Sequence, residues 1–442
     1  MFQPEWEAMP RDELLRLQSE RLRQTVERVY HRVPFYRRQL DERGIKPEQI
    51  RSAEDITRLP FTRKQDLRDQ YPFGLFAVDL SEVKRLHASS GTKGKPTVVG
   101  YTRRDLDNWA DLCARSIVAA GGRPGDVFHN AYGYGLFTGG LGVHAGAERL
   151  GVTLVPASGG NRSRQVTLIE DFKPRGIAGT PSFILSLAET MEEMGKDPAS
   201  SSLAYGIFGA EPWSEGMRRT LEEKWGIHAV DIYGLSEVLG PGVSIECWQA
   251  KNGLHIAEDH FLVEVIDPDT GEPLPDGETG ELVFTTLTKE AIPVIRYRTG
   301  DIAAVYREPC VCGRTHARMS RIKGRVDDML IIRGVNVFPS ELEHVLLQVK
   351  EVTPHYQIII TREGTLDHFT VEVEVSESFE ARIGDRPLTE HADGVRLIDR
   401  LCRLFKDNLG VTTQVILRRP REIPRSEGKA VRVIDRRVPQ LG

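Results

Sequence analysis

Hydrophobic positions near the start of the chain recur at helical spacing. Six apolar or aromatic residues recur at roughly helical spacing among many arginines and glutamates: Leu14, Leu15, Leu22, Val26, Val29 and Tyr30. This spacing predicts that the first forty residues are helical. Pro34 marks the point at which we expect the helix to break.

Between about residue 85 and residue 240, short apolar runs alternate with helical stretches. Runs at 127–128, 152–155 and 206–208 end in turns rich in Gly, Ser or Pro, and 217–225 has a helical pattern. Such βα repetition predicts a mainly parallel sheet with helices on its faces.

Residues 260–310 have a strand pattern without intervening helices. Strands are expected at 261–266 and 280–285, with a turn at 267–271, so this part reads as a β-rich subdomain. A smaller pattern of helices and strands follows the charged segment 323–328. We therefore predict an α/β fold with a large N-terminal domain, residues 1–326, and a small α+β C-terminal domain, residues 327–442.

Composition excludes several classes of protein. Apolar residues make up 40% of the 442 residues and charged residues 28%, as in soluble globular proteins. Lysine and arginine number 59 against 64 acidic residues, so the net charge of −5 offers no basic field for nucleic acid. Apolar runs fall far short of the roughly 20 residues of a membrane span, and no secretory signal is visible. Five cysteines indicate a reducing cytoplasm rather than a disulfide scaffold.

A loop rich in glycine and hydroxyl groups is the first candidate for chemistry. Backbone amides next to glycine approach phosphates closely, hydroxyls donate hydrogen bonds, and lysine supplies positive charge. An ordinary surface turn is an equally good interpretation of this loop alone. The residues concerned are Ser89, Ser90, Gly91, Thr92, Lys93, Gly94 and Lys95.

Two further motifs follow apolar runs, so both belong at the carboxyl ends of strands, where open α/β sheets bind ligands. They are Gly209-Ala210-Glu211-Pro212 and Asp231-Ile232-Tyr233-Gly234-Leu235-Ser236-Glu237. Tyr233 there would stack on a purine, and Glu237 would hold Mg²⁺ through its oxygens. A solvated carboxylate at a helix start is the plain alternative for Glu237 alone.

The last motifs lie near the predicted domain boundary and the C-terminus. Asp301, in the stretch 297–301, would accept ribose hydroxyls, and Arg325 would support ribose or phosphate. Lys429 follows a glycine on a predicted loop, from which it could reach an anion. An Asp in a turn, a salt-bridged linker and a solvated lysine are the alternatives.

Taken together and in this order, the motifs resemble those of the adenylate-forming superfamily of acyl-CoA synthetases, adenylation domains and luciferases. Within it the chain is most similar to the phenylacetate–CoA ligase family, over almost its whole length. The stretches that carry the resemblance are 131–140, 208–213, 231–237, 297–301, 330–339 and 424–429. The resemblance implies an acyl-adenylate formed from ATP and a carboxylic acid, then a thioester formed with coenzyme A, with release of AMP and pyrophosphate.

The resemblance also implies a role for each matching residue. Ser89, Ser90, Gly91, Thr92 and Lys95 would hold the phosphates, and Gly209, Ala210, Glu211, Pro212, Asp231, Tyr233, Gly234 and Ser236 would form the adenine site. Glu237 would bind Mg²⁺, and Asp301 and Arg325 the ribose. Asp327 would be the hinge of a mobile small domain, Gly334 would border the coenzyme A tunnel, and Lys429 would drive adenylation. Apart from the resemblance, residues 418–437 hold eight basic and three acidic side chains, so part of this basic face, with Arg418 and Arg419, would receive the phosphates of the coenzyme; a solvated basic face is the plain alternative.

The acyl pocket departs from the family pattern. Tyr134, Phe137 and Gly139 suggest a pocket for an aryl acid. Ala145 stands where the family has tyrosine, and Ala257 where tryptophan is found. Two smaller side chains would widen the pocket, so we expect an aryl or arylacetic acid that need not be phenylacetate itself.

Cysteines and a histidine of the β-rich part form a separate constellation. Cys310 and Cys312 flank a single residue before a glycine, and Cys247 and His255 lie upstream. Three thiolates and one imidazole complete a closed tetrahedral zinc site, which predicts a structural rather than a catalytic ion. His260 and His316 are the substitutes if His255 points elsewhere, and two ordinary thiols are the plain alternative.

Three functions compete at this point. The first is an aryl-acid–CoA ligase, and the second is an adenylating enzyme that passes the acyl or AMP group to a carrier-protein thiol or another cofactor. The third is a nucleotide-binding regulator without catalysis, against which the presence of Glu237 and Lys429 speaks. The sequence leaves the assembly open, with a homodimer as one candidate.

Overall fold

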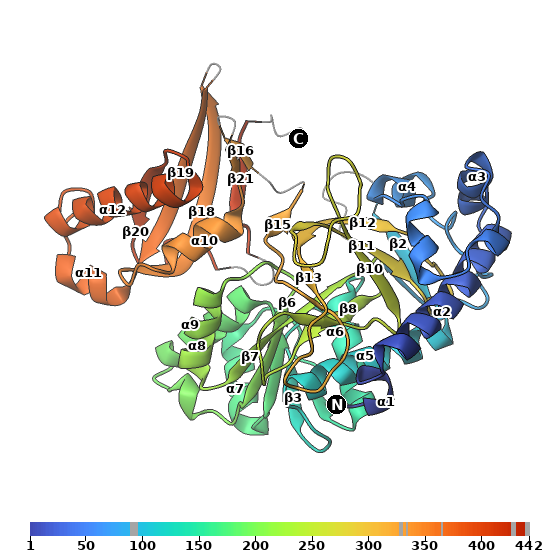
Figure 1. Cartoon of the computed structure of the whole chain (residues 1–442). Helices are drawn as coiled ribbons and strands as arrows, with labels where there is room; N and C mark the ends of the chain where they lie inside the picture. The colour runs from blue at the N-terminus through green and yellow to red at the C-terminus, as the bar shows by residue number, and fades with distance from the viewer. Residues whose placement is uncertain (89–95, 327–329, 333–334, 364–365, 426–429, 438–442) are drawn as a thin grey trace.

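Two unequal parts make up the computed structural model of this chain, a large one coloured blue to yellow and a small orange one (Figure 1). The structure describes residues 1–88, 96–326, 330–332, 335–363, 366–425 and 430–437. The small part has a hydrophobic core of its own, formed by residues from Leu330 to Leu417.

A nine-stranded sheet forms the centre of the large part, in the order β13-β14-β9-β8-β7-β6-β5-β3-β4. Its strands are β3 (Val127–Asn130), β4 (Thr153–Val155), β5 (Gly176–Gly179), β6 (Tyr205–Gly209), β7 (His228–Leu235), β8 (Gly240–Glu246), β9 (Leu254–Ile256), β13 (Val305–Tyr306) and β14 (Arg318–Met319). The expected parallel arrangement holds for β4, β3, β5, β6 and β7. Beyond β7 the sheet is antiparallel, because the short connection 236–239 returns the chain directly into β8 without a crossover.

Helices cover both faces of the parallel strands, as the βα pattern predicts. They are α5 (Arg103–Ala119), α6 (Thr138–Leu150), α7 (Arg162–Phe172), α8 (Pro181–Glu193) and α9 (Glu215–Trp225). Neighbouring strand residues point to opposite faces. Phe208 of β6 packs in the core beneath α7, α8 and α9, whereas Ile207 packs in the core beneath α5 and α6.

A second, four-stranded antiparallel sheet lies beside the first. It consists of β10 (Phe261–Ile266), β11 (Gly280–Thr286), β12 (Tyr297–Ala303) and β15 (Gly324–Arg325). Leu22, Val26 and Val29 of α2 share its core, which explains the helical spacing in the sequence. The remaining elements of the N-terminal third are α1 (Pro4–Glu7), α2 (Arg11–Arg32), α3 (Pro34–Glu42), α4 (Lys64–Asp69), β1 (Arg85–Ala88), β2 (Val98–Tyr101) and the 3₁₀ helices at Pro47–Gln49 and Ala53–Arg58. A further 3₁₀ helix, Pro198–Ser200, contacts α8 and α9, which cover the first sheet.

The small part has the predicted α+β composition. A sheet in the order β20-β19-β18-β21 is accompanied by three helices and a hairpin. The elements are β16 (Leu330–Ile332), β17 (Val335–Val337), α10 (Pro339–Leu346), β18 (Val352–Glu363), β19 (Leu366–Val375), α11 (Glu377–Ile383), α12 (Ala392–Leu409), β20 (Gln414–Arg418) and β21 (Val433–Asp435). In α12, Leu397, Leu401 and Phe405 are buried at intervals of four residues, so one face of the helix covers the sheet.

The observed architecture confirms the predicted fold class, a large part of βα layers with a β-rich subdomain and a small α+β part. None of the helices in the described ranges is both long enough and apolar enough to cross a membrane.

Candidate active site

The carboxyl ends of β3, β6 and β7 meet at one edge of the nine-stranded sheet, because these strands run parallel. The loop 131–137 follows β3, the motif 209–212 begins at the last residue of β6, and the motif 231–237 spans the end of β7. Motifs that are far apart in sequence therefore share one edge, as expected.

The turn after β6 has a fixed and unusual backbone. A Cβ on Gly209 would lie 2.2 Å from the carbonyl oxygen of Ile232, so the close approach of β6 and β7 requires glycine. Ala210 follows with φ of 68°, a left-handed conformation that non-glycine residues rarely adopt. Local strain of this kind concentrates at functional sites.

Tyr233, Asp301 and Arg325 join the two sheets of the large part. The hydroxyl of Tyr233 donates to Oδ2 of Asp301 at 2.6 Å, and Nη1 of Arg325 donates to Oδ1 at 2.9 Å. Asp301 and Arg325 are register partners of β12 and β15. Burial, together with the negative charge of Asp301, raises the pKa of Tyr233 well above its usual range, so the hydroxyl remains a donor. The carboxylate is thereby oriented at the seam between the sheets.

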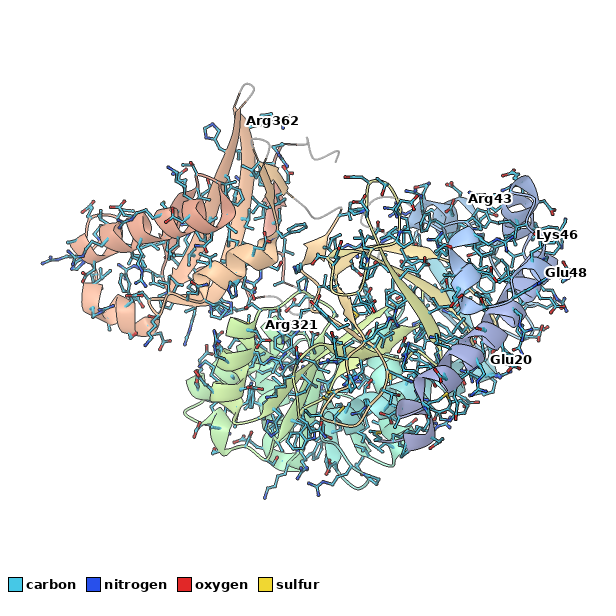
Figure 2. All side chains as sticks on the ribbon, viewed as in Figure 1. Glu20, Arg43, Lys46, Glu48, Arg321 and Arg362 are labelled. Carbon is cyan, nitrogen blue, oxygen red and sulfur yellow. The ribbon has the colours of Figure 1, made fainter. Side chains whose placement is uncertain are left out.

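Asp231 lies deeper, in a buried charged cluster. Its backbone N–H donates to the carboxylate of Glu246 at 2.9 Å. The same carboxylate also accepts a hydrogen bond from the guanidinium of Arg218 at 2.7 Å. Arg321, labelled in Figure 2, lies 3.8 Å from the Asp231 carboxylate and stacks on Trp213. Burial raises the pKa of Asp231 to about 7 although Arg321 opposes the shift.

Glu237 is buried, with 6% of its surface exposed, and no hydrogen bond links its carboxylate to another side chain within the described ranges. Ser236 precedes it and lies 3.1 Å from the hydroxyl of Thr138, at the start of α6. The ammonium of Lys289 is also buried, over the ring of Tyr101 at 4.5 Å. Burial lowers the pKa of Lys289 to about 8, although the negative charges of Asp105 and Glu237 act to raise it. A buried carboxylate without a hydrogen bond to a described side chain, such as that of Glu237, is suited to bind a hard cation such as Mg²⁺.

The residues predicted for the acyl pocket come largely from the loop after β3 and from α6. The hydroxyl of Tyr134 accepts from Asn130 at 2.9 Å and lies 3.2 Å from His144, against which the ring packs edge to face. Phe137 is half exposed where α6 begins, and Gly139 and Ala145 lie on that helix. Tyr134 is therefore held from two sides, whereas Phe137 borders solvent.

Ala257, also predicted for the acyl pocket, comes from a different part of the chain. It follows β9 and donates its N–H to the carbonyl of Val243. It lines a cavity of about 20 Å³ with Leu112, Arg115 and His316.

Several predicted site residues lie outside the described residues. They are Ser89, Ser90, Gly91, Thr92, Lys95, Asp327, Gly334 and Lys429. Described residues next to two of these segments contact the other motifs. Ala88 donates its N–H to Leu136 at 3.1 Å, and Ala430 donates its N–H to Glu211 at 2.9 Å. One described neighbour of each segment therefore contacts the edge that carries the other motifs.

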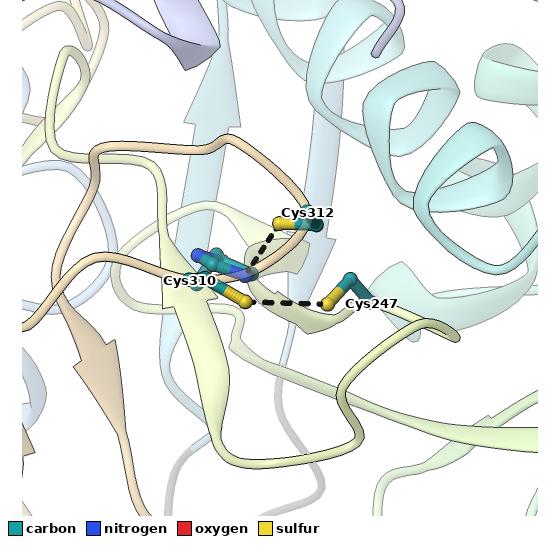
Figure 3. Close-up of side chains that lie close together, drawn as sticks. Cys247, Cys310 and Cys312 are labelled. Carbon is teal, nitrogen blue, oxygen red and sulfur yellow. Dashed lines mark hydrogen bonds between the residues drawn. The ribbon is translucent and has the colours of Figure 1, made fainter.

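The predicted zinc ligands come together at the antiparallel end of the large sheet. The ligand atoms of Cys247, His255, Cys310 and Cys312 all lie within 4.8 Å of one another. Cys247, Cys310 and Cys312 lie close together (Figure 3). The sulfurs of Cys247 and Cys310 are 3.7 Å apart, and Sγ of Cys312 lies 3.4 Å from Nε2 of His255. The hydrogen bond from Cys247 lowers the pKa of Cys312. Nδ1 of His260 instead lies 2.7 Å from the hydroxyl of Thr288. His260 is therefore not needed in place of His255 as the fourth ligand.

Two arginines of the basic segment near the C-terminus form ion pairs. Arg418 pairs with Glu372 and Arg419 with Glu380, both inside the small part. The arginines are spaced along one segment in sequence, but the carboxylates that meet them come from β19 and α11.

Comparisons with known proteins agree with this arrangement. Residues 77–287 match the family model described as AMP-binding enzyme, and residues 334–437 match that described as AMP-binding enzyme C-terminal domain. A phenylacetate-coenzyme A ligase of Thermus thermophilus is 58% identical, with 99% of this chain and 100% of the relative covered. One of Escherichia coli is 52% identical, with 96% and 95% covered. This chain belongs to the phenylacetate–coenzyme A ligase family.

Solved structures extend the comparison to the arrangement of the two parts. A 2-hydroxyisobutyryl-CoA ligase in the postadenylation state, with 2-HIB-AMP, matches with a TM-score of 0.91 and 33% identity over 98% of this chain and 91% of that one. The same ligase with 2-HIB-AMP and CoA in the thioesterification state matches with a TM-score of 0.72, over 98% and 92%.

The predicted family and enzyme class, an AMP-forming acid–thiol ligase, are confirmed by these comparisons. Glu189, Ser182 and His355 were not singled out in the sequence although they lie at the junction of the two parts. Their partners are far away along the chain, and no local pattern marks them.

Proposed function

We propose that this enzyme joins phenylacetate, or a ring-substituted arylacetic acid, to coenzyme A in two half-reactions. The carboxylate first attacks the α-phosphate of ATP, which forms an acyl-adenylate and releases pyrophosphate. The thiol of coenzyme A then attacks the acyl carbon, which forms the thioester and releases AMP. The observation that carries the proposal is that the described adenylation motifs converge on one sheet edge in a chain 51–58% identical to four phenylacetate-coenzyme A ligases.

Each group at the edge has a task in this proposal. Asp301, oriented by Tyr233 and Arg325, accepts the ribose hydroxyls, while the turn at Gly209 and Ala210 borders the adenine. Glu237 would hold Mg²⁺, which when bound offsets phosphate charge. These assignments follow the motifs, and the fixed backbone and uncommitted carboxylate described above support them.

The residues outside the described ranges keep the roles that the motifs imply. Ser89, Ser90, Gly91, Thr92 and Lys95 bind the phosphates, and Gly334 borders the path of coenzyme A. Lys429 stabilises the anionic transition state of adenylation through its positive charge. We also propose residues 1–326 and 327–442 as the two domains, with Asp327 as the hinge between them. The separate core of the small part supports that division.

The arrangement of the two domains fits the first half-reaction. The match to the relative in its postadenylation state, 0.91, exceeds that to its thioesterification state, 0.72, although the same protein and nearly the same coverage are compared. We infer that the small domain must rotate before coenzyme A reacts.

We further propose that Cys247, His255, Cys310 and Cys312 hold a structural zinc ion. Zinc–sulfur bonds of about 2.3 Å and zinc–nitrogen bonds of about 2.0 Å in a tetrahedron place two sulfurs about 3.8 Å apart and sulfur and nitrogen about 3.5 Å apart. The contacts of 3.7 Å and 3.4 Å agree with these edges. Four protein ligands leave no open position, so the ion would fasten the loop 307–317 to the sheet.

The free cysteines are also consistent with a reducing cytoplasm, which we propose as the compartment.

Pyrophosphate release, AMP release and thioester formation, measured over a panel of aryl and arylacetic acids with and without coenzyme A, test the proposed function. We expect phenylacetate or a ring-substituted relative to be turned over, with a thioester only when coenzyme A is present. Pyrophosphate release without any thioester would point to another acyl acceptor, and no pyrophosphate with any acid would overturn adenylation.

A further inference from the structure

The small domain is attached to the large one on both sides of residues 426–429. On one side, Nε of Arg425 donates to Oε2 of Glu189 at 3.0 Å. On the other, the backbone N–H of Ala430 donates to Oε2 of Glu211 at 2.9 Å. Two carboxylates of the large domain thus hold the described ends of the short segment that contains Lys429.

Glu211 is itself oriented by the large domain. Its second oxygen, Oε1, accepts the backbone N–H of Ser182 at 2.8 Å, in the first turn of α8. Free N–H groups at a helix start favour a negative charge. Each carboxylate oxygen of Glu211 therefore has one backbone donor, one from each domain, and the side chain works as a bridge.

Glu189 makes the second bridge from the other end of α8. It lies seven residues after Ser182 and accepts from His355 of β18 at 2.7 Å as well as from Arg425. Burial alone would raise the pKa of Glu189, but His355 and Arg425 outweigh it and lower this pKa to about 2, so the carboxylate is charged. Arg425 is fixed within the small domain by two bonds to Glu374, at 2.7 and 2.8 Å.

The junction contains other contacts and an open space besides the two bridges. Leu347 of the small domain packs against the core of the large one, and Glu343 accepts the backbone N–H of Ser214 at 3.1 Å. A cavity of about 160 Å³ is lined by Ser182, His355, Arg425 and Ala430 among others, so the two bridges lie beside a part of the junction that is not filled. Polar contacts of this kind suit domains that must separate again.

We propose that Glu189 and Glu211 are positioning residues of the adenylation half-reaction, which hold the ends of the Lys429 segment at the active site and release them for thioester formation. The inference rests on the proposed function, and it adds to Glu211 a role beyond the adenine site. Because the contacts belong to the arrangement that matches the postadenylation state, their loss should affect the first half-reaction selectively.

The test compares Glu211→Ala and Glu189→Ala with the wild type in each half-reaction. Loss of the charge-assisted hydrogen bonds of one carboxylate, two in each variant, should lower kcat for pyrophosphate release without coenzyme A by about 10-fold or more. In Glu189→Ala the KM for ATP should stay within about 2-fold, because this bridge acts on the position of the small domain rather than on nucleotide binding. Glu211→Ala also removes a group of the proposed adenine site, so its readout is the fall in kcat. Thioester formation from supplied acyl-adenylate should keep its wild-type rate or rise.

Glu193→Ala is the matched control. Glu193 lies on the same helix and also pairs across the domains, with Arg421 at 3.3 Å, but both side chains are well exposed. Exposed pairs contribute little, so its two half-reactions should match those of the wild type. Glu189→Gln and Glu211→Gln keep one acceptor oxygen, so their kcat for pyrophosphate release should lie between those of the wild type and the alanine variants. These glutamine variants test the inference if an alanine variant does not fold.

A raised KM for ATP with unchanged kcat, an equal loss in both half-reactions, or an effect no larger than that of Glu193→Ala would each overturn the inference. A wild type that releases no pyrophosphate with any acid would instead overturn the proposed function.

Discussion

Replacing Tyr233 with phenylalanine tests how the nucleotide site is built. The variant keeps the ring but removes the hydroxyl that donates to Asp301 at 2.6 Å. Arg325 still donates to the other oxygen of Asp301 at 2.9 Å, so the carboxylate stays in place but loses the hydrogen bond that fixes its second oxygen. No other side chain needs to move, because phenylalanine fills nearly the same volume.

The size of the effect follows from the charge of the acceptor. A hydrogen bond to a charged group contributes about 1.5 to 3 kcal/mol, which corresponds to roughly 10- to 150-fold in an equilibrium constant. Because Arg325 remains, we expect the lower end, an increase of about 10-fold in the KM for ATP. The kcat should change little, since ribose binding is the same in the ground state and the transition state.

The assay is steady-state pyrophosphate release with ATP varied at saturating acid, together with urea unfolding. Tyr205→Phe is the matched control, because Tyr205 is also buried and its hydroxyl donates to a carboxylate, Asp126, at 3.3 Å. Tyr205 begins β6, at the opposite end of the strand from the site. Both variants should lose about 1 kcal/mol of unfolding free energy, but only Tyr233→Phe should raise the KM.

An unchanged KM for ATP in Tyr233→Phe, with the control behaving as expected, would refute the assignment of Asp301 to the ribose. An equal rise of the KM in both variants would show that stability rather than orientation is being measured.

Three further variants test other parts of the account. Cys310→Ser/Cys312→Ser should lose about one zinc per chain and unfold at a lower temperature than the wild type. Metal analysis and thermal denaturation of untagged protein would detect both changes, and a metal-free wild type that unfolds at the same temperature as the variant would refute the proposed zinc site. Ala145→Tyr should shift kcat/KM toward the smaller acid in a panel of arylacetic acids, and an unchanged ranking would exclude Ala145 from the pocket. Lys429→Ala should abolish pyrophosphate release but spare thioester formation from supplied acyl-adenylate, and an equal loss of both in folded protein would contradict its role.

Local patterns predicted the elements well because they depend on neighbouring residues. The spacing of Leu22, Val26 and Val29 reflects the one face of α2 that is buried, and the apolar run that ends at Gly209 reflects a strand buried on both sides. The antiparallel half of the large sheet was not predicted, because the direction of β8 depends on how a short connection folds back.

Side-chain pairings across the fold were harder to predict. Glu189 and Arg425 are 236 positions apart, and a charged residue on a helix is usually a solvated one. The four zinc-ligand candidates were recognisable because thiols and imidazole are rare, and their chemistry limits what they can do together.

A single-turnover experiment tests the central claim most directly. Enzyme in excess over isotopically labelled phenylacetate is mixed with ATP and Mg²⁺, the products are analysed by mass spectrometry, and coenzyme A is then added. The account predicts one equivalent each of phenylacetyl-adenylate and pyrophosphate before the addition, and conversion of that adenylate to phenylacetyl-CoA and AMP after it. A thioester formed with no preceding adenylate, or an adenylate that coenzyme A leaves unchanged, would contradict the account.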